Sequence, residues 1–475
     1  MSNFTKGSKK RTYIFLVSVI TILVILFITR IQFNNDDYYM MANWREVLKN
    51  GFYTKDVLSM HHTYRASVEK WLSCALLYYI YHTWHMTGIY VVLSVIICLI
   101  AFLTYRVCFY TSGNRFMALS FTIIILTMSQ LFFQVRPQTI TCAILLSEVL
   151  CLEHFVKEGK RKYLLLLPVL SWLEMQFHST IWPCFFMVLI PYLLDFKVEQ
   201  KRVHIDKSKT KVLAISGLAC FGSLFLNPYG AWSVWYIFLS YGNKYMNEMI
   251  VELTRPDLFQ SGIWVWCVVI VIAFLAGNRK MPTRYWLLFV GFFLFMWTAK
   301  RNAVFFDIVG AFPLCYMLRE KKINFEYNLV PLAPLLAVLF LVPAIMAPHD
   351  PRQESIANYI EVIDKLADDY GVHGENIFCD YNTGSYAEYV GYHPYFDSRA
   401  EIFTKRVNGH EELWKEYVDM TSGNLYYKDF VDKYHFAYLV VDERCAPSLY
   451  NGLLHDDDYQ TLITYKDYAV FAPKK

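Results

Sequence analysis

Long apolar runs, separated by short polar connections, occupy most of the first 348 residues of the chain. A helix crosses roughly 30 Å of hydrocarbon with about 17 to 25 mainly apolar residues. Eleven runs approach or reach that length, at 12–32, 86–106, 116–134, 138–156, 163–179, 181–196, 211–226, 262–278, 284–299, 303–319 and 328–348. The pattern predicts a mainly α fold, a polytopic membrane helical bundle of about eleven spans.

One further apolar run, WLSCALLYYIYHTW at 71–84, has only about 14 residues and is short for a span. We expect it to form an interfacial or re-entrant helix. Lys and Arg concentrate in the cytoplasmic connections of membrane proteins. If 71–84 does not cross and the N-terminus is inside, the segments KEGKRK, NRKMPTR and REKK all fall inside. A twelfth span would move most of these charges outside, so the charge pattern favours eleven.

The first apolar run follows the basic segment KGSKKR and is too long for the core of a signal peptide, and no small-residue cleavage site follows it. These features predict a retained anchor with a cytoplasmic N-terminus. Eleven spans from that start place the last part of the chain outside. We therefore expect a transmembrane module at 1–348 and an extracytoplasmic domain at 349–475.

The segment 349–475 differs in composition from the rest, being rich in charge and Tyr. It opens with the helix-like ESIANYIEVIDKLADDYG, and the strand-like runs NIFCDY, FAYLVVD and YAVFAPK follow. This order predicts a small α/β domain. The segment contains two cysteines, Cys379 and Cys445, which an oxidising compartment would allow to pair, although no spacing motif requires it.

Composition supports a membrane protein. The chain is 56% hydrophobic and 18% charged, against about a quarter charged in ordinary soluble domains. The net charge of +4 carries little meaning as a total, because the placement of Lys and Arg decides more. We expect membrane lipids and no nucleic acid among the partners.

Polar residues gather on the connections that this topology places outside. They are Asp36 and Asp37 after the first span, Glu69 and Lys70 in the same loop, Arg136 at RPQ, His178 at FHST, the turn NPYG, and Lys300 and Arg301 at AKRN. Each has an ordinary alternative, such as a solvated acid, a helix-end histidine or an interfacial arginine whose charge reaches water. The outer Lys-Arg pair runs against the charge rule, and an anionic ligand would explain it.

Four acids fall inside the predicted membrane runs. They are Glu148, Glu153, Glu174 and Asp307. Because an ionisable side chain facing lipid is costly, we expect all four to face other helices or a cavity.

Acids, bases and aromatic residues at a membrane edge suit transfer chemistry on a lipid-linked substrate. A carboxylate can take the proton of an attacking hydroxyl. An arginine can hold a departing phosphate through charge-assisted, often bidentate hydrogen bonds. The residues permit glycosyl transfer without requiring it.

The order of these features resembles the bacterial C-type (GT-C fold) integral-membrane glycosyltransferases. The resemblance rests on the acidic pair, NWREVLKNG, Arg-Pro, FH, NPYG, an outer Arg before a late span, and YNTGSYAEYVGYHPYFDSRAEIF in the tail. It covers nearly the whole chain. It implies a polyprenyl-phosphate-linked sugar as donor and a glycan, lipid or protein as acceptor.

The resemblance also implies residue roles. Asp36 or Asp37 would be the general base or an acid that orients the acceptor. Arg301 would contact the donor phosphate, and Arg136 and His178 would line the site.

The resemblance places further substrate contacts at Lys300, Glu69, Asp397 and Arg399, and the chain departs from the family pattern at Glu69. Lys300 would bind beside the donor contact, and Asp397 and Arg399 match the Asp-x-Arg pattern of the tail. Related sequences tend to have His-Glu before Trp-Leu, whereas this chain has Glu69 and Lys70 in VEKWL, which leaves a second acidic role for Glu69 open. Paired carboxylates also suit a divalent cation, Mg or Mn.

These inferences lead to one hypothesis and two alternatives. We expect a membrane glycosyltransferase that works on the outer face, in cell-envelope glycan assembly. A transporter or flippase of lipid-linked saccharides would carry ionisable residues near the bilayer midplane, which only Glu148 suggests. A non-catalytic glycan-binding membrane scaffold would tolerate changes at Asp36, Asp37 and Arg301.

Overall fold

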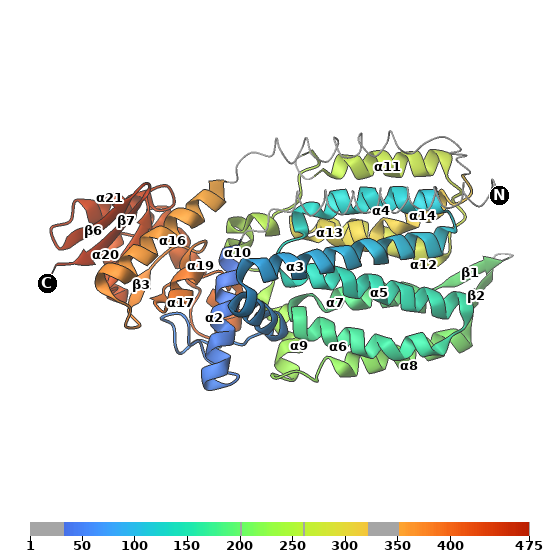
Figure 1. Cartoon of the computed structure of the whole chain (residues 1–475), viewed down its shortest axis with the longest axis horizontal. Coiled ribbons are helices and arrows are strands. Elements are labelled where there is room, and N and C mark those ends of the chain that lie inside the picture. The colour runs from blue at the N-terminus through green and yellow to red at the C-terminus, as the bar shows by residue number, and fades with distance from the viewer. Residues whose placement is uncertain (1–32, 200–201, 260–261, 322–350, 475) are drawn as a thin grey trace. The chain divides into compact units, whose positions relative to one another are not determined.

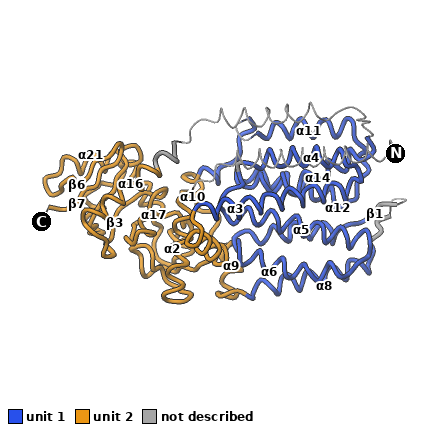
Figure 2. Tube along the Cα trace, viewed as in Figure 1, with its two compact units in different colours: residues 1–32, 86–226, 251–348 blue, residues 33–85, 227–250, 349–475 orange. Residues whose placement is uncertain are grey.

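The computed structural model describes residues 33–199, 202–259, 262–321 and 351–474 (Figure 1). The predicted spans at 12–32 and 328–348 lie outside these residues. The chain forms two compact units (Figure 2). The helical unit contains the described residues of 86–226 and 251–321, and the mixed unit contains 33–85, 227–250 and 351–474.

The helical unit is an assembly of α-helices with short 3-10 and π segments and one hairpin. Its elements are the second part of α3 (Trp71–Ser112), α4 (Arg115–Ser129), η1 (Gln130–Phe132), α5 (Pro137–Glu158), η2 (Arg161–Leu166), α6 (Leu167–His178), η3 (Ser179–Ile181), α7 (Pro183–Leu193), β1 (Phe196–Glu199), β2 (Arg202–Ile205), α8 (Lys207–Ser223), η4 (Val251–Leu253), α11 (Ile263–Ala276), α12 (Thr283–Met296), η5 (Lys300–Asn302), α13 (Ala303–Phe305), η6 (Phe306–Gly310) and α14 (Phe312–Met317). Each predicted apolar run between 86 and 319 coincides with one of these helices or with a few consecutive ones.

Local sequence explains where these helices begin and end. Asn114 caps α4, because its side chain accepts hydrogen bonds from the backbone N–H groups of Phe116 and Met117. Pro137 starts α5, where its missing N–H costs nothing, and Gly159 ends it in the left-handed conformation.

Helix α3 consists of two helices that meet at His85. This residue has φ 49° and ψ −148°, which no α-helix contains. The segment 71–84 is therefore a helix distinct from the one that begins after His85, as predicted. Among the described helices, α3 and α5 are long and apolar enough to cross a membrane, and the other apolar helices have 10–17 residues. The count of about eleven spans stays a prediction.

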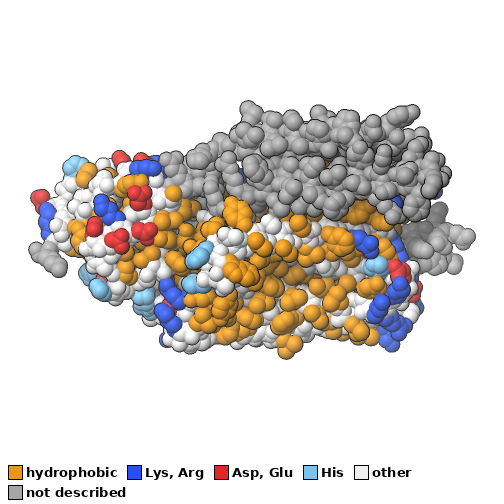
Figure 3. Space-filling model, viewed as in Figure 1, with side chains coloured by type: hydrophobic (Ala, Val, Ile, Leu, Met, Phe, Trp, Pro, Cys, Tyr) orange, Lys and Arg blue, Asp and Glu red, His pale blue; other side chains and the backbone are white. Residues whose placement is uncertain are grey.

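The connections predicted to be cytoplasmic share one end of the helical unit. Lys157 donates to the carbonyl of Tyr110 at 2.7 Å, and Asn114 donates to the carbonyl of Lys321 at 2.9 Å. The Thr283 hydroxyl donates to the carbonyl of Phe196 at 2.7 Å. On the face shown in Figure 3, Lys and Arg side chains gather at this end, where β1 and β2 lie. The side of the membrane on which this end lies stays a prediction.

On the face shown in Figure 3, apolar side chains cover much of the described surface of the helical unit. Leu218 on α8 is 72% exposed and Leu275 on α11 is 79% exposed. Apolar patches of this extent are rare on soluble monomers. The surface suits contact with lipid tails.

The C-terminal part of the mixed unit is a small α/β fold, as predicted. Its five-stranded sheet has the order β4-β3-β5-β7-β6, with β3 parallel to β4 and β5, and β7 antiparallel to β5 and β6. The strands are β3 (Asn376–Phe378), β4 (His393–Pro394), β5 (Tyr438–Asp442), β6 (Tyr459–Tyr465) and β7 (Tyr468–Pro473), and the helices are α16 (Pro351–Tyr370), α17 (Gly384–Val390), η7 (Ala400–Phe403), α18 (Lys405–Asn408), α19 (Leu413–Thr421), α20 (Tyr427–Tyr434) and α21 (Pro447–Leu454). The predicted strand runs correspond to β3, β5 and β7.

A buried apolar core joins the sheet to α16. Val440 of β5 and Val470 of β7 are fully buried in it, and Val362 and Leu366 of α16 pack on the same core. Of the two tail cysteines, Cys379 is buried and Cys445 is exposed, and both are free thiols.

Three helices from earlier in the chain belong to the same unit. They are α2 (Asn35–Asn50), α9 (Ala231–Ser240) and α10 (Lys244–Met249), together with the first part of α3. The predicted division at residue 348 follows the chain, whereas the contacts of the fold group 33–85 and 227–250 with the tail. The mixed unit is thus built from three separate stretches of sequence.

Candidate functional site

The first two turns of α5 carry a group of polar side chains in the helical unit. Arg136 donates to both carboxylate oxygens of Glu252 at 2.7 Å. The Gln138 amide donates to the carbonyl of Arg301 at 2.8 Å. The backbone N–H of Lys300 donates to the carbonyl of Thr254 at 2.9 Å, which joins η5 to the end of η4.

Thr141, one turn further along α5, links two polar residues of α6. Its hydroxyl donates to Glu174 at 2.8 Å and lies 3.0 Å from Nδ1 of His178. Which of Thr141 and His178 donates in this pair depends on the histidine tautomer. We call these residues the α5 polar group: Arg136, Gln138, Thr141, Glu174, His178, Glu252, Lys300 and Arg301.

The structure thus brings together the predicted residues Arg136, His178, Lys300 and Arg301. Their contact with a substrate stays a prediction. Glu252, Gln138 and Thr141 were missed, because single polar residues on apolar helices and interfacial turns give no signal on their own.

The four acids of the predicted membrane runs are buried, as expected. Glu148, Glu153 and Glu174 have no exposed surface, and Asp307 is 2% exposed. Asp307 accepts a hydrogen bond from the Trp266 indole at 2.7 Å. Glu148 differs, since both its carboxylate oxygens are buried without a hydrogen-bond partner among the described residues.

The predicted acidic pair begins α2 in the mixed unit. Asp37 is buried, and its carboxylate accepts a hydrogen bond from the Asn34 N–H at 2.7 Å, while the Asn34 side chain caps the third residue in return. This reciprocal pair is a capping box, and acids are favoured in the first turn of a helix. Asp36 is only half-buried. The two acids therefore have different surroundings.

The predicted Glu69 lies in a loop that packs on the NPYG turn and α9. Glu69 is buried and accepts a hydrogen bond from the Ser67 hydroxyl at 2.5 Å. Ser67 in turn accepts from the Trp232 indole at 2.9 Å, and the Arg65 guanidinium lies 3.3 Å from the centre of a Trp232 ring. The NPYG turn contributes the Tyr229 hydroxyl, which accepts from the N–H of Val68 at 3.0 Å.

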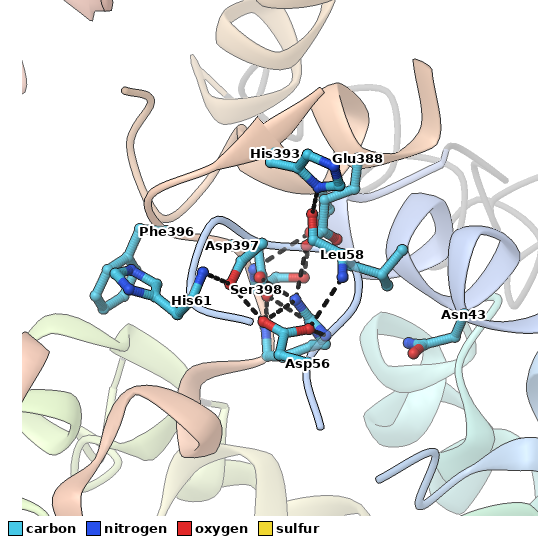
Figure 4. Close-up of polar contacts among 12 residues, drawn as sticks. Asn43, Asp56, Leu58, His61, Glu388, His393, Phe396, Asp397 and Ser398 are labelled. Atoms are coloured by element: carbon cyan, nitrogen blue, oxygen red, sulfur yellow. Dashed lines mark hydrogen bonds and ion pairs between the residues drawn. The ribbon is translucent and has the colours of Figure 1, made fainter. Parts of the chain in front are cut away.

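Arg399 lies at the centre of a buried ion cluster in the mixed unit. It donates to Asp56 at 2.7 Å, to Glu388 at 2.7 Å, and to Asp397 at 2.6 Å and 3.0 Å. Figure 4 shows the three carboxylates converging from the loop after α2, from α17 and from the segment after β4. Arg399 is 7% exposed and the acids 1% or less. We call these four residues the Arg399 cluster.

One guanidinium cannot balance three carboxylates, and the acids respond differently. Burial raises the pKa of Glu388 well above its ordinary value, and the neighbouring Asp397 and Asp56 add to this effect against the attraction of Arg399. Burial acts in the same sense on Asp56. There, however, the charge and hydrogen bonds of Arg399 outweigh it and hold the pKa below its ordinary value.

The cluster contains two predicted residues, Asp397 and Arg399, and two missed ones. In the sequence, Asp56 and Glu388 are single acids with no motif around them. Their contact with Arg399 crosses more than 300 residues for Asp56, so local sequence gives no signal for it.

The predicted divalent cation finds no ready-made ligand set in the described ranges. Among those residues, no three His, Cys, Asp or Glu side chains are arranged to hold a metal ion. Asp36 and Asp37 are consecutive on a helix, so their side chains point about 100° apart. We derive no step through Mg or Mn.

Comparison with known proteins finds likeness in fold alone. No protein-family model and no curated protein matches the sequence. The oligosaccharyltransferase of Archaeoglobus fulgidus, solved with a tethered acceptor peptide containing the NVT sequon, matches with a TM-score of 0.60 at 11% identity, covering 98% of this chain and 74% of that one. The arabinofuranosyltransferase AftD from Mycobacteria matches with a TM-score of 0.56 at 10% identity, covering 97% of this chain and 41% of that one.

Both matches span nearly the whole of this chain, including the tail. Both proteins are membrane glycosyltransferases of the GT-C fold. The chain therefore has the fold that its sequence resembles.

Proposed function

We propose that this chain is an integral-membrane glycosyltransferase that transfers a sugar from a polyprenyl-phosphate donor to an acceptor on the outer face of the membrane, in cell-envelope glycan assembly. The observation that carries the proposal is the GT-C fold, matched over 98% of the chain to a protein that glycosylates an acceptor peptide. The match to an arabinofuranosyltransferase adds a second transferase of the same fold.

The reaction breaks the bond between the anomeric carbon and the phosphate oxygen and forms a bond from that carbon to the acceptor oxygen. The acceptor hydroxyl loses its proton to a base, and the polyprenyl phosphate leaves with the electron pair of the broken bond. We assign the base to Asp36. A base needs access to the acceptor, and Asp36 is half-buried, whereas Asp37 is buried and caps α2.

The departing phosphate needs cations, and the α5 polar group offers them. Arg301 and Lys300 lie on η5, and Arg301 is held through its carbonyl by Gln138. We assign the phosphate contact to Arg301, with Lys300, Arg136 and His178 around it. Arg136 already pairs with Glu252, so we give it a supporting role.

Transfer by the purified protein tests the proposal. The full-length protein in lipid nanodiscs is given polyprenyl-phosphate sugars together with glycan, lipid or peptide acceptors. We expect one donor and one acceptor class to yield a glycosylated product and free polyprenyl phosphate in equal amounts. Arg301→Gln should raise the donor KM, whereas Arg444→Gln, at a half-exposed side chain of the mixed unit, should not. Donor consumed only by hydrolysis, or no turnover in any combination, would count against the proposal.

One observation favours a second candidate. Glu148 is buried inside α5 with neither carboxylate oxygen hydrogen-bonded among the described residues, and such acids occur in transport pathways. A flippase of lipid-linked saccharides would move fluorescent polyprenyl-phosphate sugars between the leaflets of liposomes without any acceptor. Glu148→Gln would abolish that movement.

A further inference from the structure

The first turn of α2 is attached to the C-terminal fold through Asn35. The Asn35 side-chain carbonyl accepts a hydrogen bond from the backbone N–H of Ser385 at 3.1 Å. Its amide donates to the carbonyl of Tyr381 at 2.8 Å. Asn35 is 8% exposed and directly precedes Asp36. One buried side chain therefore fixes the backbone next to the proposed base.

Arg45 attaches α2 a second time, about three turns later. Its guanidinium donates to the carbonyl of Glu388 at 2.9 Å and to that of Tyr389 at 2.6 Å. Both carbonyls belong to the last turn of α17, where helix carbonyls lack partners within the helix and a cation is favoured. Both halves of α2 are thus hydrogen-bonded to α17. Asn35 in the first half contacts the start of α17, and Arg45 in the second half contacts its end.

The loop after α2 is attached a third time, through the Arg399 cluster. Arg399 joins Asp56 of this loop to Glu388, the residue whose carbonyl Arg45 holds. Beside it, the N–H of Met60 donates to the carbonyl of Pro394 at 3.1 Å, and His61 bonds the carbonyl of Tyr395 at 2.9 Å. The loop therefore follows the backbone of the tail closely.

Gly384 allows this arrangement at the start of α17. A Cβ at this position would lie 1.9 Å from the carbonyl oxygen of Phe396, so only glycine lets the two backbones approach. The same approach places Ser385 so that its N–H reaches Asn35 and its hydroxyl lies 2.8 Å from that of Ser398. The segment from Tyr381 to Arg399 is thus a rigid support for α2.

We propose that Asn35 and Arg399 are positioning residues, through which the C-terminal fold holds the carboxylate of Asp36 in place for the transfer reaction. The inference rests on the proposed function. It also changes the role of Arg399, which acts through carboxylates of this chain instead of contacting substrate. Asn35 touches neither reacting group, and its effect passes through the backbone to Asp36.

The test uses Asn35→Ala in the full chain in nanodiscs, with Asn35→Asp as the conservative variant. Asn35→Ala loses both hydrogen bonds, whereas Asn35→Asp keeps the acceptor for Ser385 and loses the donor to Tyr381. Because misplacing a catalytic group by about 1 Å can cost on the order of 100-fold in rate, we expect kcat to fall roughly 10- to 100-fold in Asn35→Ala and less in Asn35→Asp. The donor KM should change little. The melting temperature should fall by a few degrees, because two buried hydrogen bonds are lost, so rates are normalised to folded protein.

Hydrogen exchange gives a reading that does not depend on activity. Amides of the first two turns of α2 should exchange faster in Asn35→Ala, while those of β5 and β7 keep their wild-type rates. Arg399→Lys should produce the same faster exchange, because one ammonium cannot reach three carboxylates as a guanidinium does. Lys433→Ala serves as the control, since Lys433 is half-exposed and pairs with Glu411 and Glu416 in the same unit.

The outcomes separate the two proposals. Faster α2 exchange with lower kcat and unchanged KM supports positioning. Unchanged α2 exchange in both Asn35→Ala and Arg399→Lys overturns it, and so does a fall in rate that matches only a loss of folded protein. If wild type has no transferase activity with any donor, the proposed function fails, and faster exchange alone would then show attachment without a catalytic role.

Discussion

The mixed unit and the helical unit both bury carboxyl groups, but within the described ranges one acid of the helical unit, Glu148, lacks the hydrogen bonds that compensate the others. In the mixed unit, three acids share the guanidinium of Arg399. In the helical unit, Glu148 is equally buried and has no hydrogen bond from any described residue. Burying a charge costs free energy unless the charge is paired. Arg399 offsets this cost for the three acids of its cluster, whereas the cost of burying Glu148 has to be offset by other parts of the fold.

The helical unit contains its own internal control, five residues further along α5. Glu153 is also fully buried, but it accepts hydrogen bonds from Arg284 at 3.0 Å, Tyr192 at 3.0 Å and Tyr285 at 2.9 Å. The difference between Glu148 and Glu153 therefore arises from their partners and not from depth of burial. Burying the carboxyl of Glu148 therefore costs more than burying that of Glu153.

Removing the cation of the Arg399 cluster should have the largest effect on stability. Arg399→Met leaves three buried carboxylates facing one another. We expect a loss of about 3 to 5 kcal/mol in the free energy of unfolding, the usual cost of breaking a buried ion pair from one side. Chemical denaturation of the full chain, followed by tryptophan fluorescence, measures it.

The control variant is Lys433→Met. Lys433 is 46% exposed and pairs with Glu411 and Glu416, so its loss should cost at most about 1 kcal/mol. Equal losses in the free energy of unfolding would mean that the buried Arg399 cluster contributes no more to stability than an ion pair at the surface.

Replacing the two α5 acids should sharpen the comparison within the helical unit. Glu148→Met removes a carboxyl that lacks partners and should leave stability unchanged or raise it by about 1 to 3 kcal/mol. Glu153→Met should instead destabilise by a similar amount, because it deprives Arg284 and two tyrosine hydroxyls of their acceptor. Melting temperatures in one detergent would compare the two. A loss of stability in Glu148→Met as large as in Glu153→Met would contradict the contrast.

The smallest expected effect is a pH dependence in the Arg399 cluster. Glu388 has a raised pKa in the folded protein, so its contribution to stability is present at low pH and is lost as the pH rises through that folded value. Asp56 has a lowered pKa, so its contribution is present at neutral pH and is lost as the pH falls through its folded value. Stability should decline on both sides.

Glu388→Gln separates the two limbs. It removes the decline that accompanies rising pH and keeps the decline at low pH, which belongs to Asp56. Unfolding free energies measured across the pH range would show this. A decline with rising pH that persists in Glu388→Gln would assign it to another group.

Hydrophobic patterning predicts most of the helical unit because each apolar run forms its helix locally. The run 138–156 is an example, since it matches α5 closely. The capping box of Asn34 and Asp37 is also local, and the spacing of the two residues could have indicated that Asp37 caps the helix. The sequence-based prediction instead treated Asp36 and Asp37 as equivalent candidates for the base.

Contacts between distant parts of the chain were beyond such patterns. The hydrogen bond from Ser385 to Asn35 joins residues that are 350 positions apart, and a single sequence does not show which distant residues come into contact. Asp397 and Arg399 were singled out from their resemblance to a motif, but their partners Asp56 and Glu388 were not. An acid in a loop has the same local appearance whether water or a buried arginine faces it.

The central claim, that Asp36 is the base of a glycosyl transfer, is tested most directly by comparing Asp36→Asn with Asp37→Asn. Initial rates of sugar transfer are measured in nanodiscs at saturating donor and normalised to folded protein. We predict that Asp36→Asn lowers kcat by about 100- to 10,000-fold, the range of a general base, whereas Asp37→Asn lowers it less and chiefly weakens the start of α2. Asp36→Asn turning over at the wild-type rate would contradict the account.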